Sequence, residues 1–235
     1  ELLESLFQID KTNQYFLFYN SHKDLSKNLP KWSENNIHYT KTNWPNKLFN
    51  LSIKIFGYPK IDKLIIAKNN LPSLDIFLST NINFTAISKN TKFIQTIHDL
   101  SYKIYPKFYS LKRRIWHYLV NPKKLCKQAT YVIAPSNSTK NDLIKYYKLN
   151  ANKIQVTYPG LAFDMIKNLN TREQVKEIKE KYSLPDNYIL FLGTIEPRKN
   201  IAGLIESFEQ VIEAGINNQY LVIAGVNGWK NRSIY

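Results

Sequence analysis

The sequence predicts an α/β fold built around parallel strands, and three observations support this prediction. Apolar runs of about five residues, the usual length of a strand, recur along the chain and alternate with longer segments of helical spacing. Such alternation is typical of a parallel sheet that helices cover on both faces. Hydrophobic residues make up 43% of the chain and aromatic residues 14%, which supplies a core and argues against disorder.

The expected strands are short, and the expected helices lie between them. The strands are YFLFY (15–19), DIFLS (75–79), FIQTI (93–97), TYVIA (130–134), KIQVT (153–157), YILFL (188–192) and YLVIA (220–224). The helices are expected at 1–10, 45–56, 109–126, 138–148, 171–182 and 201–214.

Two of these helices carry specific signals. The first has apolar residues at helical spacing from its first turn, so we expect a fragment whose sequence begins inside a helix. Ser136 and Ser138 indicate the start of the helix at 138–148, because serine is a preferred N-cap. Asp142 lies in the first turns of this helix.

Composition excludes several classes of protein. The single cysteine, Cys126, rules out an internal disulfide framework and fits a reducing, cytoplasmic compartment. The longest clean apolar run, YLVIAGV (220–226), is far shorter than the roughly 20 residues that span a bilayer. Metal-ligand spacing, a GxSxG nucleophile elbow, and Walker or GxGxxG phosphate motifs are all missing from the sequence, so we expect no bound metal or cofactor.

Positive charge is concentrated in the first two thirds of the chain. The formal net charge is +15, of which residues 1–166 carry +14. No acidic residue lies between Asp99 and Asp142, and KFYSLKRRIWHYLVNPKKLCK (107–127) is the densest basic stretch. A basic helix with aromatic residues favours an anionic membrane surface or nucleic acid as partner, whereas the alternative is an ordinary solvated face.

We expect a domain junction near residue 165, where the polar stretch KNLNTREQ (167–174) begins and the charge balance changes. Residues 1–165 would form a Rossmann-like domain of the usual domain size. Residues 166–235 would begin a second Rossmann-like domain. Because one strand–helix–strand unit cannot cover both faces of a sheet, we expect this second domain to be incomplete.

The loop GTIEPRKN (193–200) is the first candidate site, because ligands of open α/β sheets bind beyond the carboxyl ends of strands. Gly193 permits a tight exit from the strand, and Asn200 is an acceptable N-cap for a helix that begins at Ile201. The free amides of that first turn would face the ligand.

Two cations in this loop indicate the kind of ligand. Arg198 and Lys199 precede the positive end of the helix dipole, where each would cost roughly 0.3–1 kcal/mol. A bound anion, most plausibly phosphate, would make this placement favourable. The alternative is a solvated turn whose charge is partly offset by Glu196.

His98 and Asp99 form the second candidate site, beyond the strand FIQTI. A histidine at this position could donate to a sugar hydroxyl or a phosphate, or transfer a proton. The alternative is a structural histidine that is hydrogen-bonded at the end of a strand.

In this order, the motifs resemble those of retaining GT-B glycosyltransferases of family 4, the group 1 glycosyltransferases. The resemblance covers nearly the whole chain, and the ordered set is more specific than any one piece. The matching segments are SLDIFLSTN (73–81), QTIHDLSYKIYP (95–106), YVIAPSNSTKNDLIKYY (131–147), KIQVTYPG (153–160), YILFLGTIEPRKNIAGLIESF (188–208) and LVIAGVNGW (221–229).

The resemblance implies that two Rossmann-like domains close over a nucleotide-diphospho-sugar donor and a glycan or lipid-linked acceptor. The sugar is transferred with retention of configuration and without a metal. Lys199 carries over as the diphosphate-binding lysine, Arg198 as its helper, and His98 as a catalytic residue near the transferred sugar. Asp99, Gly193, Thr194 and Asn200 are expected to belong to the substrate site with them.

The chain departs from the family pattern at several points. Gly193–Thr194 stands where many relatives have Gly-Arg, so Arg198 is expected to substitute for that missing cation. Gly160–Leu161–Ala162 stands where relatives often have Gly-Val-Asp, so no acidic role is assigned there. The paired glutamates of the family and the glycine-rich loop of its first strand are not in the sequence, so we expect the 235 residues alone to be inactive.

The resemblance also bears on partners and location. Many relatives act on lipid-linked acceptors at the cytoplasmic membrane face, so we expect a cytoplasmic protein, peripheral to the inner membrane face, that binds no nucleic acid. Two alternatives stay open: a non-catalytic basic Rossmann-like module that binds an anionic membrane or nucleic acid, and another GT-B enzyme such as a phosphorylase or an epimerase. Donor sugar, base, acceptor and oligomeric state are not determined by the sequence.

Overall fold

The structure is a computed structural model that describes residues 2–32, 34–160 and 171–229. The chain divides into two compact units, which are described separately. Unit 1 comprises Glu1–Ile104 and Leu111–Gly160, and unit 2 comprises Tyr105–Ser110 and Leu161–Tyr235. The junction expected near residue 165 falls within 161–170 and therefore lies outside the described residues.

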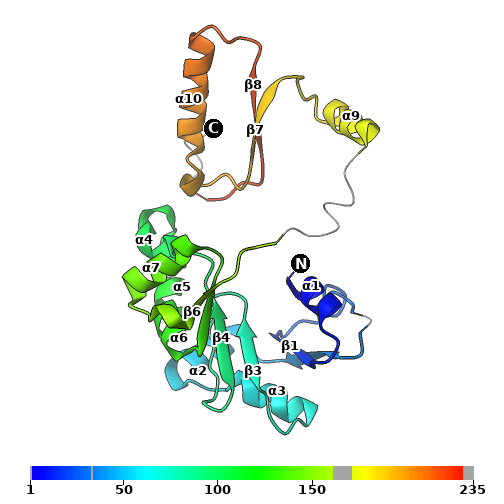
Figure 1. The fold of residues 1–235 in the computed structure, drawn as a ribbon, viewed down its shortest axis with the longest axis vertical. Helices are drawn as coiled ribbons and strands as arrows, with labels where there is room; N and C mark the ends of the chain where they lie inside the picture. Colours follow the sequence, from blue (N-terminus) through cyan, green and yellow to red (C-terminus); the bar gives the residue numbers. More distant parts are fainter. Residues whose placement is uncertain (1, 33, 161–170, 230–235) are drawn as a thin grey trace. The chain divides into compact units, whose positions relative to one another are not determined.

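Unit 1 contains two sheets of parallel strands (Figure 1). The first pairs β1 (Tyr15–Asn20) with β2 (Ile37–Thr42). The second has the order β3 (Ile76–Ser79), β4 (Lys92–Thr96), β5 (Tyr131–Ala134) and β6 (Ile154–Val156). The helices of this unit are α1 (Leu2–Ile9), α2 (Asn46–Phe56), α3 (Ile61–Asn69), α4 (Ser101–Ile104), α5 (Leu111–Val120), α6 (Pro122–Gln128), α7 (Asn137–Tyr147) and the 3₁₀ turn η2 (Ala151–Lys153).

Two buried clusters stabilise unit 1. The larger packs β4 and β5 against α6 and α7, with Ile97, Val132 and Leu143 fully buried. The smaller joins α2 and α3 through Phe49, Ile65 and their neighbours. Side chains that contact both clusters, including that of Phe77, tie the two together.

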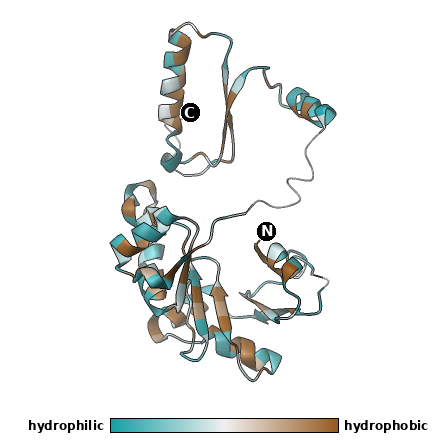
Figure 2. Ribbon diagram, in the orientation of Figure 1, coloured by the Kyte–Doolittle hydropathy of each residue, from teal (hydrophilic) through white to brown (hydrophobic). Residues whose placement is uncertain are grey.

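Unit 2 is a strand–helix–strand arrangement preceded by a helix. It contains η1 (Pro106–Phe108), α9 (Arg172–Lys181), β7 (Tyr188–Leu192), η3 (Pro197–Lys199), α10 (Ile201–Glu213) and β8 (Tyr220–Ala224), and β7 and β8 are parallel. Figure 2 shows α9 as predominantly hydrophilic. Among the described residues of this unit, the buried hydrophobic ones are Ile195 and Ile201.

The α/β fold class with parallel, Rossmann-like strands is confirmed, and each expected strand is present. The single helix expected over 109–126 is wrong, because Asn121 adopts a left-handed conformation and separates α5 from α6. The sequence reading also missed β2 and α3. Four of the six residues in the strand IHYTKT are polar, and α3 has little amphipathic character, so neither stands out as a pattern.

Candidate functional site

The loops that follow β7 and β8 lie side by side at the carboxyl ends of these strands. The amide of Gly193 donates to the carbonyl of Ala224 at 2.9 Å, and the amide of Ile195 donates to that of Val226 at 3.0 Å. The amide of Gly228 in turn donates to the carbonyl of Ile195 at 3.0 Å. The first part of the candidate anion loop, residues 193–195, is therefore held by the loop that follows β8.

Two glycines permit this close approach. A Cβ atom on Gly225 would lie 1.8 Å from the carbonyl oxygen of Gly193, and one on Gly228 would lie 2.7 Å from that of Ile195. Both distances are too short for any side chain. The half-buried Thr194 packs its methyl group against Gly228, since a Cβ there would lie 2.9 Å from Cγ2 of Thr194.

Arg198 and Lys199 lie on the 3₁₀ turn η3, which precedes α10 and is not part of its first turn. The amide of Lys199 donates to the carbonyl of Glu196 at 3.0 Å, which closes this turn. Both cations therefore precede the α-helix that begins at Ile201, as expected, and the structure adds that they lie on a 3₁₀ turn with their side chains exposed.

The charge of Arg198 is already paired. Its Nη2 and Nε atoms lie 2.8 Å and 3.0 Å from Oε1 of Glu196. The carboxylate side chain is only 4% exposed, whereas that of the arginine is 42% exposed. A buried carboxylate requires such a partner. The guanidinium therefore holds the loop together. The sequence left open that Glu196 partly offsets the positive charge of this loop, and the ion pair shows such an offset for Arg198.

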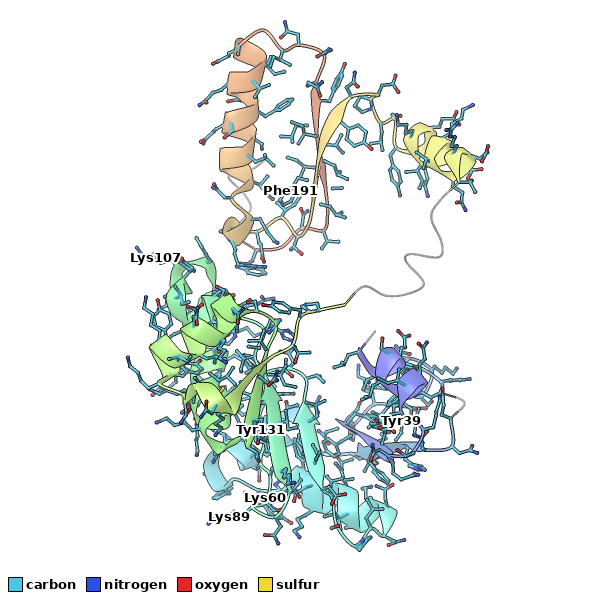
Figure 3. All side chains as sticks on the ribbon, viewed as in Figure 1. Tyr39, Lys60, Lys89, Lys107, Tyr131 and Phe191 are labelled. Carbon is cyan, nitrogen blue, oxygen red and sulfur yellow. The ribbon has the colours of Figure 1, made fainter. Side chains whose placement is uncertain are left out.

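Lys199 is the uncompensated cation of the loop. The part of the chain that the structure describes offers its ammonium group neither a hydrogen bond nor an ion pair. Its stem folds back over the strand end, because Cε lies 3.9 Å from the position of a Cβ on Gly193. Phe191, labelled in Figure 3, packs beside the same glycine.

Asn200 occupies the N-cap position of α10, as expected, but its side chain does not cap the helix. The residue adopts a left-handed conformation with φ 50° and ψ 45° and makes no side-chain cap hydrogen bond. Its amide group instead lies over Gly203, where a Cβ would approach Nδ2 to 2.6 Å. Among the described residues, no side chain thus accepts from the first amides of α10, which are suited to an anionic ligand.

His98 lies at the end of β4 in unit 1, with an exposed side chain. Its Nε2 lies 3.0 Å from the carbonyl oxygen of Thr80, and its own carbonyl accepts from Oγ1 of Thr139 at 3.1 Å. Because a carbonyl oxygen can only accept, Nε2 carries the proton in this contact. In the neutral ring, Nδ1 is then an acceptor. The histidine therefore ties two strand ends together and keeps one nitrogen for other contacts.

Asp99 lies two residues before the short helix α4. Its Oδ1 accepts from the backbone amide of Ser101 at 2.8 Å and from the hydroxyl of the same residue. Such an Asx turn fixes the chain at the end of β4. One carboxylate oxygen is therefore engaged in local structure.

The sequence reading missed Gln95, a fully buried residue in the middle of β4. Its Nε2 donates to the carbonyl of Asn81 at 3.1 Å and to that of Thr96 at 2.8 Å. With His98, it fastens the loop after β3 to the end of β4. The signal was present, since an amide within the apolar run FIQTI is unusual.

The candidate residues fall in both units. His98 and Asp99 belong to unit 1, whereas the 193–200 loop belongs to unit 2. Within the described ranges, no group of three or more His, Cys, Asp and Glu side chains could hold a metal ion. The same residues include no helix long and apolar enough to cross a bilayer.

Parallel strands, with the candidate side chains at their carboxyl ends, place the chain among the Rossmann-like α/β proteins. Residues 17–164 match the family described as Glycosyltransferase Family 4, and the chain therefore belongs to this family.

Relatives with curated names agree with the family. The chain is 25% identical over 151 residues to an O-antigen chain mannosyltransferase B of Escherichia coli, which covers 63% of this chain and 39% of that protein. It is 29% identical over 97 residues to a serotype-specific mannosyltransferase WbdA of the same species, covering 41% of this chain and 12% of that one. The chain thus spans well under half of each relative.

Among solved structures, a glycosyltransferase from Rickettsia africae ESF-5 superimposes with a TM-score of 0.47 at 18% identity. The superposition covers 91% of this chain and 69% of that one. The likeness is distant, and the family assignment rests on the matched residues 17–164.

Proposed function

We propose that this protein is a glycosyltransferase that moves a sugar, with retention, from a nucleotide-diphospho-sugar to a glycan or lipid-linked acceptor in cell-envelope polysaccharide synthesis. The observation that carries the proposal is the exposed, uncompensated Lys199 beside uncapped helix amides, in a chain of glycosyltransferase family 4. The names of the mannosyltransferase relatives favour a hexose, and mannose in particular, as the transferred sugar.

The loop would act by stabilising the departing diphosphate. As the glycosidic bond to the donor breaks, negative charge develops on the leaving phosphate oxygens. The ammonium of Lys199 and the uncapped first amides of α10 would receive that charge, as preorganised donors do in other enzymes. On this proposal, Lys199 and these amides have the role that a metal ion has in other enzymes, and no metal is required.

His98 would serve the sugar end of the donor. With Nε2 donating to Thr80, its Nδ1 is available to accept from a sugar hydroxyl. Asp99 and the strand-end loops beside it would complete this part of the substrate site. The protein would work in the cytoplasm, peripherally at the inner face of the membrane, where a lipid-linked acceptor is presented.

Binding of a diphosphate tests the proposal without requiring turnover. We expect pyrophosphate, GDP or UDP to bind the 235-residue chain, as followed by calorimetry or amide chemical shifts at 193–203. Lys199→Ala should weaken binding by about 10- to 100-fold, because a charge-assisted hydrogen bond contributes about 1.5–3 kcal/mol. Lys176→Ala, at an exposed lysine of α9 with a 78% exposed side chain, is the matched control.

Equal loss in both variants would point to unspecific attraction and contradict the assignment of the loop. A second candidate function, a non-catalytic basic module, is favoured by the basic face of unit 1. For such a module, Lys199→Ala would leave the affinity for its partner unchanged, because surface binding needs no diphosphate loop.

A further inference from the structure

Helix α2 has apolar side chains on two opposite faces. Phe49 and Ile53 are buried in the smaller cluster of unit 1. Leu48, Leu51 and Ile55, spaced at i, i+3 and i+7, form a second stripe that is more than half exposed. Figure 2 shows this helix as predominantly hydrophobic. The fold of unit 1 accounts for the buried face but not for the exposed stripe.

Helix α5 also exposes apolar side chains at helical spacing. Leu111, Ile115 and Tyr118, at i, i+4 and i+7, form an exposed stripe in which the tyrosine is 81% exposed. We call the two stripes, Leu48, Leu51, Ile55, Leu111, Ile115 and Tyr118, the α2–α5 face. The side chains within each stripe are neighbours on their helix, and exposed apolar side chains grouped in this way generally mark an interaction site, whereas isolated ones do not.

A groove of about 660 Å³ links the two helices. Lys54 of α2 lines it together with Leu111, Arg114, Ile115 and Tyr118 of α5, so the stripe of α5 forms one wall. Tyr102 and Tyr147 also line the groove, and their hydroxyl groups hydrogen-bond at 2.8 Å.

The charge of the groove has one sign. Lys54, Lys103, Arg114 and Lys123 line it, and its lining includes no carboxylate. Cations without carboxylate neighbours attract an anionic partner. The apolar side chains beside these cations leave water on binding only if the partner also has an apolar region.

A bilayer that contains anionic lipid meets both requirements. Its phosphate groups match the cations, and its headgroup–acyl boundary accepts leucine, isoleucine and tyrosine side chains. Nucleic acid would match only the cations, because exposed aliphatic stripes gain little from a phosphate backbone. Long basic side chains can also extend their charged ends to the headgroups while their stems lie on apolar surface.

We propose that the α2–α5 face is the surface by which unit 1 docks on an anionic bilayer, with a lipid phosphate in the groove between α2 and α5. The assignment rests on the membrane contact proposed above. It is independent of the diphosphate loop, because every residue of the face and groove belongs to unit 1.

Vesicle sedimentation with the 235-residue chain tests the proposal. We expect binding to vesicles of phosphatidylcholine with phosphatidylglycerol, weakening with salt, and little binding to phosphatidylcholine alone. Removing the groove cations in Lys54→Ala/Arg114→Ala/Lys123→Ala should lower affinity by on the order of 100-fold, at about fivefold per cation. The matched control is Lys63→Ala/Lys89→Ala/Lys92→Ala, which changes net charge equally at exposed lysines that do not line the groove (Lys89 is labelled in Figure 3).

A second variant tests the apolar contribution at constant charge. Ile55→Ser/Tyr118→Ser alters two exposed side chains, so we expect an unchanged circular dichroism spectrum and weaker vesicle binding. Lys199→Ala should bind vesicles normally, and the groove variant should bind pyrophosphate normally, which separates this proposal from the donor site.

Three results would overturn the proposal. Equal losses in the groove and control variants would mean that net charge alone drives binding. Unchanged vesicle binding by Ile55→Ser/Tyr118→Ser would mean that no apolar contact forms. Binding of a short DNA duplex that depends on the groove cations, together with no vesicle binding, would identify nucleic acid as the partner.

Discussion

At the scale of single residues, His117 shows how packing changes chemistry. Its ring stacks on that of Tyr102 with centroids 4.2 Å apart, and its Nδ1 hydrogen-bonds to the carbonyl of Arg113 at 2.8 Å. Burial is the main cause that lowers the pKa of His117 below its usual value of 6.5, and the charge of Arg113 adds to the effect. The folded protein therefore resists protonation at this site.

This lowered pKa makes folding stability depend on pH. As the pH falls below about 6.5, the unfolded chain protonates His117 before the folded chain does, so the free energy of unfolding decreases. Above that pH both states are neutral at this residue and the effect is absent. We expect His117→Gln to lose less stability on acidification, measured as the urea midpoint between about pH 7.5 and about pH 5. Parallel pH profiles for the two proteins would contradict the assignment.

The residues of the candidate site were partly predictable. Lys199 and Gly193 follow from a strand, a glycine loop and a helix, which are local patterns. The pairing of Arg198 with the buried Glu196 was weighed only as a possibility, because burial of a carboxylate depends on the neighbouring loop. The left-handed conformation of Asn200 was not predicted, since its sequence context fits an ordinary cap.

At the scale of elements, the break between α5 and α6 rests on one residue. Asn121 adopts φ 54°, and its side chain accepts from the amide of Lys124 at 3.1 Å. Pro122 at the first helical position favours a new helix over a continued one. An Asn-Pro pair commonly marks a turn. Because apolar residues continue at helical spacing on both sides of the pair, the periodicity alone predicts one continuous helix.

The two roles of Asn121 can be separated by substitution. Asn121→Ala loses the cap and places a Cβ-bearing residue without a polar side chain in the left-handed region, so it should destabilise unit 1 by about 1–3 kcal/mol. Asn121→Gly loses only the cap and should cost a few tenths to about 1 kcal/mol. Chemical denaturation of both variants measures the difference. Equal destabilisation would show that backbone conformation contributes nothing there.

At the scale of the whole molecule, the two units differ in how much apolar surface they bury. Ile97, Val132 and Ala134 in and beside the central strands of unit 1 are fully buried. In unit 2, Leu190 of β7 is half exposed and Leu192 of the same strand is 76% exposed. The fold class was predictable because strand length and alternation are local, whereas this imbalance depends on what covers each face.

Hydrogen exchange should report the imbalance directly. Amides of β4 and β5 should exchange more slowly than those of β7 and β8, by on the order of a hundredfold or more, because local opening is easiest where few apolar contacts are lost. Mass spectrometry of peptides from each strand measures the rates. Equal protection in both sheets would show that unit 2 draws stability from contacts other than apolar burial.

The pairing of Arg198 with Glu196 also affects the end of a catalytic cycle. In many enzymes the slow step is release of product, and a nucleoside diphosphate held by two full cations would leave slowly. Here the charge of Arg198 is paired within the protein, so Lys199 is the one full cation of the loop that attracts the product, beside the first amides of α10. On the proposed reaction, the buried carboxylate of Glu196 limits the affinity for the nucleoside diphosphate product, so that this product can dissociate.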